Sequence, residues 1–194
     1  MTTLNREELR KKIKTTWINI RFPFFAPRDH KTDKIVWEKI SKQSYWWSIP
    51  DGWRTAFGIR FAKDFKRAIR HSKKPLFFVN IKEKFGILDL TLNAYTDEIF
   101  KLISKYVKLS STTCIKCGKK ADGKTYPWIF PLCYDCYADP KNNYVARKLS
   151  FKTFEFEKLS DEAKREYLLE AQNDEYNYGH NVPHKYTNDE GEDI

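Results

Sequence analysis

Membrane-spanning segments and the usual enzyme signatures are missing from this sequence. No run of about 18 uncharged apolar residues occurs, so the chain lacks a conventional transmembrane helix. The opening residues MTTLNREELRKK lead into no apolar stretch, which argues against a secretory signal peptide. There is no Walker loop, GxSxG motif or HExxH motif. We therefore expect no membrane partner and no enzymatic activity.

Histidine and cysteine are scarce, and their placement restricts the chemistry further. The four histidines lack metal-ligand spacing, since the one pair that is four residues apart, His180 and His184, has Pro183 between them. All four cysteines lie between Cys114 and Cys136, without the spread of a disulfide framework. This usage is typical of a reducing compartment, so we predict a cytoplasmic protein.

Apolar and charged residues are plentiful. The 194 residues are 41% hydrophobic and 16% aromatic, which is enough to form the core of one main globular unit. Residues 1–150 carry 31 Lys and Arg against 14 Asp and Glu, a net +17, whereas residues 151–194 carry 5 against 12, a net −7. A basic body of this kind attracts polyanions such as nucleic acid or nucleotides, although a solvated lysine-rich surface has the same composition.

The first fifty residues predict one helix and an irregular connection. Asn5 can cap a helix whose apolar stripe comprises Leu4, Leu9, Ile13 and Trp17, with its Lys and Arg residues facing solvent. Residues 21–50 are rich in aromatic residues and interrupted by proline, so we expect a loop pinned to the core, with at most a short helix near 34–42.

The next sixty residues predict a helix, a hairpin and another helix. Asp51 can cap a helix that ends near 71–74, and the runs at 76–82 and 87–93 predict an antiparallel hairpin packed against it. Thr96 can cap a third helix. Its predicted inward stripe comprises Ile99, Phe100, Ile103 and Val107.

Together these elements predict an α+β fold, in which a small antiparallel hairpin or sheet is packed by helices and extended by a four-cysteine zinc-ribbon-like module. A helix is expected over 161–172. The predicted units are an N-terminal helix with its connection (1–50), a helix-hairpin-helix core (51–110), a zinc module packed on the core (111–140), a C-terminal extension (141–172) and a flexible acidic tail (173–194).

The cysteines form two CxxC pairs, Cys114 with Cys117 and Cys133 with Cys136, with 15 residues between the pairs. Two residues between thiolates let a tight turn present both sulfurs to one ion, and the second pair completes a tetrahedron. We predict one structural zinc ion with no open coordination position. A redox CxxC pair and an iron–sulfur cluster use the same ligands and remain alternatives.

Several motifs resemble a family of small, mostly uncharacterised bacteriophage and prophage proteins. They are DGW at 51–53, IKEKFG at 81–86, TCIKCG at 113–118 and WIFPLCYDC at 128–136, within a similar region of roughly 45–138. Where the family often has GGLR, this chain has Gly86, Ile87, Leu88 and Asp89. The resemblance implies a phage accessory protein acting in a bacterial cytoplasm, and it brings no settled function.

The leading hypothesis is a non-enzymatic protein that binds nucleic acid or a nucleotide through a basic surface containing aromatic residues. Each lysine can equally be a solvated residue, and each aromatic ring can belong to the core. The candidate ligand-binding residues are Lys63, Lys66, Arg67, Arg70, Lys116, Lys119, Lys120, Trp46, Trp47 and Tyr126. The alternative is an interaction module that inhibits or redirects a host defence or transcription protein, using exposed Trp and Tyr as anchors.

Overall fold

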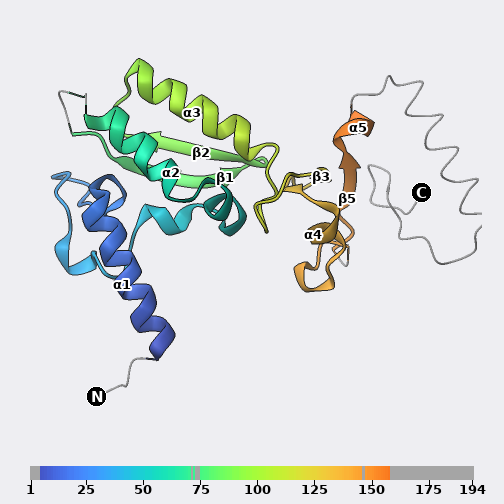
Figure 1. Cartoon of the computed structure of the whole chain (residues 1–194), viewed down its shortest axis with the longest axis horizontal. Helices are drawn as coiled ribbons and strands as arrows, with labels where there is room; N and C mark the ends of the chain where they lie inside the picture. The colour runs from blue at the N-terminus through green and yellow to red at the C-terminus, as the bar shows by residue number, and fades with distance from the viewer. Residues whose placement is uncertain (1–4, 71, 73–74, 146, 158–194) are drawn as a thin grey trace, which may run out of the picture.

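The computed structural model describes residues 5–70, 72, 75–145 and 147–157 (Figure 1). The helix predicted over 161–172 and the tail predicted over 173–194 lie outside the described residues. The α-helices are α1 (Arg6–Arg21), α2 (Asp51–Arg70), α3 (Asp97–Ser110), α4 (Tyr134–Ala138) and α5 (Phe154–Glu157). The strands are β1 (Phe78–Lys84), β2 (Ile87–Leu92), β3 (Gly123–Tyr126), β4 (Pro131–Leu132) and β5 (Ser150–Thr153). This is the predicted α+β class.

Two small antiparallel sheets organise the chain. Strands β1 and β2 form the predicted hairpin, in which Ile81 is opposite Leu90. The second sheet has the order β4-β3-β5, so a strand from beyond the cysteines pairs with β3, which lies between them. Figure 1 shows this second sheet and α4 beside one end of the hairpin and its helices. The sequence did not predict β5.

The hairpin packs against α2, as predicted, through a cluster of aromatic rings. Phe78 on β1 lies 5.1 Å from Phe65 and 6.2 Å from Phe61, measured between ring centroids. Tyr106 on α3 lies 4.6 Å from Phe61. Because successive strand residues point to opposite faces, the leucines at alternate positions of β2 are all buried beneath the helices. The core therefore lies between the hairpin and the α2–α3 pair.

Residues 22–50 are the irregular connection expected from their prolines. They contain three short 3-10 helices, at Pro23–Phe25, Trp37–Lys39 and Tyr45–Ser48. Phe25 is fully buried, and its ring stacks on Phe78 at 5.2 Å. Trp46 is also buried against Phe25. Aromatic side chains thus anchor this segment to the core.

Helix α1 contradicts the predicted inward stripe. Its buried residues are Thr15, Ile18 and Asn19, whereas Leu9, Ile13 and Trp17 are exposed. The physical reason is polar docking. The Asn19 amide donates to the backbone carbonyls of Ile40 (2.8 Å) and Gln43 (2.7 Å), and the Trp47 indole N–H donates to the Thr15 hydroxyl oxygen (2.9 Å). A helix held by hydrogen bonds leaves its apolar side free, and periodicity alone does not detect this.

Helices α2 and α3 match their predictions with local differences. Asp51 is the first residue of α2 rather than its cap, and its carboxylate pairs with Arg54. Gly58 (φ 52°, ψ −157°) interrupts the helical geometry of α2, in a conformation that is open to glycine. In α3 the Thr96 cap is confirmed by the bond from the Ile99 N–H (3.3 Å). Phe100, predicted to face inward, is exposed, and Tyr106 is buried instead.

Candidate metal centre and basic cleft

The first cysteine pair sits on a tight turn that follows α3. The Gly118 N–H donates to the Cys114 carbonyl (3.0 Å), and the Cys114 N–H donates to the Lys119 carbonyl (2.8 Å). The positive φ of Gly118 (80°) lets the chain reverse immediately after Cys117. Both thiols of this pair therefore lie on the same side of the turn, as the CxxC spacing predicted.

The second pair comes from the start of a short helix. Cys133 precedes α4, and Cys136 lies within that helix. The N–H groups of Cys136 and Tyr137 both donate to the Cys133 carbonyl (3.1 Å each). Strand β4 leads directly into Cys133, so the second sheet positions this pair opposite the first turn.

These two pairs converge on one point. The four Sγ atoms lie within 4.8 Å of one another, and Cys117 Sγ is 3.6 Å from Cys133 Sγ. Cys114 and Cys133 are buried, and Cys117 and Cys136 are half-buried. A tetrahedral ion with metal–sulfur bonds of about 2.3 Å separates its ligands by about 3.8 Å, so the spacing fits one ion. The cluster can hold a metal ion, as the sequence predicted.

The protonation of the thiols also reflects their crowding. Burial acts to raise the pKa of Cys114, but N–H groups of Cys117, Cys133 and Lys116 outweigh it and the pKa lies below its usual value. Burial raises the pKa of Cys133 to about 11 and also raises that of Cys136. Four thiolates in such a small volume repel one another, and a divalent cation removes that cost.

The start of α2 docks directly on the first cysteine turn. The Gly52 N–H donates to the Ile115 carbonyl (2.9 Å), and the Trp53 indole N–H donates to the Thr113 carbonyl (2.8 Å). A Cβ at Gly52 would collide with the carbonyl oxygens of Cys114 and Ile115. The DGW motif is therefore the contact between the core and the metal centre, and the module is packed on the core.

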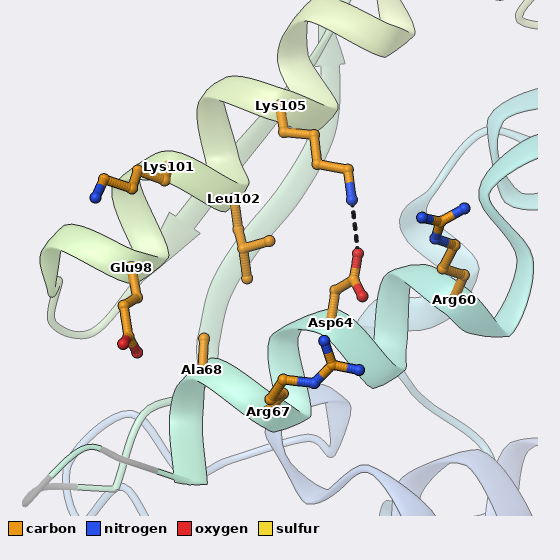
Figure 2. Close-up of a pocket in the computed structure, with 8 residues that line it drawn as sticks. All are labelled: Arg60, Asp64, Arg67, Ala68, Glu98, Lys101, Leu102 and Lys105. Atoms are coloured by element: carbon orange, nitrogen blue, oxygen red, sulfur yellow. Dashed lines mark hydrogen bonds and ion pairs between the residues drawn. The ribbon is translucent and has the colours of Figure 1, made fainter.

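A second candidate site is a cleft of about 510 Å³ between α2 and α3 (Figure 2). Arg60 and Arg67 border it from α2, and Lys101 and Lys105 border it from α3. The remaining lining residues are Asp64, Ala68, Glu98 and Leu102. Four cations against two carboxylates give the cleft a net positive charge, and Ala68 and Leu102 supply its apolar part.

Asp64 organises the inner side of this cleft. Its Oδ2 accepts a bond from Lys105 Nζ (2.7 Å) and another from the Tyr106 hydroxyl (2.9 Å). Burial acts to raise the pKa of Asp64, but the bonds from Lys105 and Tyr106 and the nearby Arg60 outweigh it, so the pKa lies below its usual value. Asp64 therefore stays ionised and holds Lys105 in place at neutral pH.

The predicted ligand-binding cations do not form one surface. Arg67 lines the cleft, and Lys63, Lys66 and Arg70 are exposed on the same helix. Lys66 donates to the Arg21 carbonyl (3.1 Å) and is thus directed toward α1. The three lysines Lys116, Lys119 and Lys120 are exposed on the first cysteine turn, where Lys119 pairs with Asp135 (3.5 Å).

The predicted aromatic residues are likewise dispersed. Trp46 is buried, so its predicted role in stacking on bases is wrong. Trp47 is half-buried, with the Arg54 guanidinium 4.8 Å above its ring, and Tyr126 lies on β3. The sequence reasoning missed Arg60, Lys101 and Lys105, although the four-residue spacing of the two lysines on a predicted helix was the available signal.

The motifs that suggested a phage family either lie in the segment that carries the cysteines or contact it. DGW docks on the first cysteine turn, and IKEKFG ends in the β1–β2 turn, where the Gly86 Cα approaches Ile129 between the cysteine pairs. Among the residues that the structure describes, no helix is long and apolar enough to cross a membrane. The family resemblance stays a prediction, because comparisons with protein-family models, curated proteins and solved structures gave no match.

Proposed function

We propose that this is a non-enzymatic protein that binds a phosphate-bearing ligand, nucleic acid or a nucleotide, in the α2–α3 cleft, on a body held together by one structural zinc ion. The observation that carries the proposal is that four cations from two helices line one cleft, Arg60 and Arg67 on α2 and Lys101 and Lys105 on α3. Figure 2 shows the Lys105 side chain reaching across to Asp64, whereas the Lys101 side chain extends away from α2. Neither helix alone supplies this arrangement.

The charge around the cleft favours an anionic ligand. Lys63 and Arg70 on α2 and Lys108 on α3 are exposed near the same helix pair and extend the positive surface beyond the cleft. Lys101, Lys105 and Lys108 follow one another at helical spacing, so they form a row along one side of α3. Phosphates bound along such a row release counterions, which makes the affinity depend on salt concentration.

The apolar part of the cleft is aliphatic rather than aromatic. Ala68 and Leu102 offer no ring on which a base can stack, and Trp46 is in the core. We therefore expect the cleft to bind its ligand mainly through phosphate and sugar groups. Such contacts position a nucleic-acid strand but do not distinguish its bases. We expect weak dependence of affinity on base sequence.

Zinc is the metal that best fits the cysteine centre. The four thiols fill every position of a tetrahedron, which leaves no site for water or substrate and makes the role structural. The sulfur spacing suits a single ion. The cysteines are buried or half-buried between α2, β4 and α4, which also suits a structural role for the ion.

The test compares a double charge reversal in the cleft with an equal charge reversal elsewhere on the surface. Arg67→Glu with Lys105→Glu removes two cleft cations, and the control Lys31→Glu with Lys141→Glu changes two exposed lysines elsewhere. Fluorescence anisotropy with labelled single- and double-stranded oligonucleotides should show a cleft-specific loss, with the salt slope reduced by about two. Competition by ATP separates nucleotide from strand binding.

Equal weakening by both double variants, or no binding by the unchanged protein, would contradict the proposal. Metal analysis of the same preparations should give one zinc per chain. That readout is independent of the ligand, so the zinc and binding parts of the proposal can fail separately.

The exposed aromatic residues support the second candidate, a protein-interaction module. Trp128 and Phe85 are 71% and 73% exposed. Exposed Trp side chains are common anchors in protein interfaces. Recovery of one host protein in stoichiometric amount, lost on Trp128→Ser and insensitive to nuclease, would favour this function over the first.

A further inference from the structure

Helix α1 carries an apolar stripe that is about half exposed in the described part of the chain. Leu9, Ile13, Trp17 and Ile20 are 49%, 60%, 54% and 62% exposed. At about 100° per residue they fall on one side of the helix, opposite the buried side formed by Thr15, Ile18 and Asn19. The stripe is continuous over three turns, unlike the single apolar residues found on most surfaces.

Cations border this stripe on both sides. The same helical geometry places Arg10, Lys14 and Arg21 along one edge and Lys12 along the other. Glu8 falls on the docked side, and Glu7 lies beside Lys14 on the first edge. An apolar strip between two basic edges is the pattern of helices that lie in a membrane interface.

A cationic cavity adjoins one edge of the stripe. It measures about 500 Å³ and includes Arg10, Lys11 and Lys14 of α1. The other lining residues are Glu7, Trp47, Asp51 and Arg54. Its four cations outnumber its two carboxylates, so it offers a place for a phosphate group beside the apolar residues.

We propose that α1 binds the surface of an anionic lipid bilayer. Leu9, Ile13 and Trp17 enter the boundary between headgroups and acyl chains, while Arg10 and Lys14 contact lipid phosphates at the mouth of the cavity. Tryptophan is favoured at this depth because its ring is apolar and its N–H is polar. The absence of a spanning segment led us to expect no membrane partner, and a helix lying on the surface needs no such segment.

Two observations favour a lipid surface over other partners. Helix α1 projects from the body (Figure 1), so a fluid surface can reach its exposed apolar residues without a matching groove. A second copy would bring its own basic edges against these.

The experiment is flotation of the full chain with vesicles of phosphatidylcholine alone and of phosphatidylcholine mixed with phosphatidylglycerol. Binding should require the anionic lipid and fall about tenfold in Ile13→Asp, because an exposed isoleucine no longer enters the bilayer. The matched control is Phe100→Asp, which changes an equally exposed apolar residue on α3 and should leave binding unchanged.

A second pair of variants separates charge from apolar contact. Arg10→Gln with Lys14→Gln should weaken binding to anionic vesicles, whereas Lys31→Gln with Lys141→Gln should not. Brominated lipids should quench the wild-type fluorescence more than that of Trp17→Phe. Circular dichroism confirms that each variant is folded, which is expected since every changed side chain is exposed.

Absence of binding to anionic vesicles would overturn the proposal, as would undiminished binding by Ile13→Asp. A dimer that dissociates in Ile13→Asp, or an acidic protein captured through the stripe in place of vesicles, would also overturn it. These outcomes leave the α2–α3 cleft untouched, because none of the changed α1 residues lines it.

Discussion

Gly52 lies where helix α2 meets the cysteine turn, and its lack of a side chain allows this contact. The backbone of Gly52 lies against the carbonyls of Cys114 and Ile115, and Gly118 of the same turn lies close to the Gly52 carbonyl oxygen. Gly58, further along α2, is different, because open space surrounds it and only its positive φ requires glycine. Gly52 is therefore required by close packing, and Gly58 by its backbone conformation.

Gly52→Ala and Gly58→Ala should each lower the free energy of unfolding by about 2 kcal/mol, the first through overpacking and the second through backbone strain. Only Gly52→Ala should also weaken metal retention, because it displaces the Cys114 carbonyl. Competition with a chelator measures metal retention, and denaturant melts measure stability. Equal metal affinity in the two variants would show that the contact does not support the centre.

Asp64 makes a pH-dependent contribution to stability. Its pKa is lower in the folded protein than the 3.8 of the free side chain, so the contribution is fully present above about pH 4 and is lost as the pH falls through the folded value. Asp64→Asn should cost about 1–2 kcal/mol at pH 7, with the difference from wild type shrinking in acid.

Asp64→Asn should change ligand binding in the opposite direction to stability. Removing the carboxylate makes the cleft more positive, so Asp64→Asn should bind oligonucleotides more tightly even though it is less stable. Thermal melts at pH 7 and pH 3, paired with anisotropy at pH 7, test both effects. A constant stability difference across this pH range would exclude the ionised carboxylate as the cause.

At the scale of elements, metal loss should affect more than the cysteine loops. Chelation, or Cys114→Ser with Cys133→Ser, should loosen residues 111–139 first and also the first turn of α2, because Gly52 and Trp53 bond to that turn. We expect a loss of about 3 kcal/mol, or roughly 6–12 °C in melting temperature.

Hydrogen-exchange mass spectrometry locates this effect. Peptides covering residues 51–54 and 111–139 should exchange faster without metal, while the β1–β2 hairpin stays protected. Unchanged exchange in both regions would show that the cysteines hold no structural ion.

Local patterns predicted the elements best where one physical cause dominates. The alternating leucines of β2, the Thr96 cap and the CxxC spacing each depend on neighbouring residues, and each was confirmed. The buried side of α1 was mispredicted because it depends on bonds from Asn19 to residues over twenty positions away. The cleft was missed for a similar reason, since Arg67 and Lys105 come to line one cleft only after α2 and α3 pack together.

At the scale of the whole molecule, positive and negative charge are concentrated in different parts of the chain. Residues 173–194 carry six acidic residues and one lysine, a net −5, next to a strongly basic body. A chain ending at Gln172 should bind polyanions about two- to fivefold more tightly at low salt, because a competing anion has been removed. High salt should abolish the difference. Equal affinity of the two chains at low salt would mean that the tail does not compete.

Strand β5 gives the order of synthesis a role in assembling the metal centre. The ribosome releases Cys136 before residues 150–153, so all four ligands are available before the strand that completes their sheet. The nascent chain can therefore bring its four cysteines together before β5 exists. Pairing of β5 with β3, and stacking of Phe151 on Tyr137 of α4, then consolidate the sheet and helix from which the second cysteine pair comes.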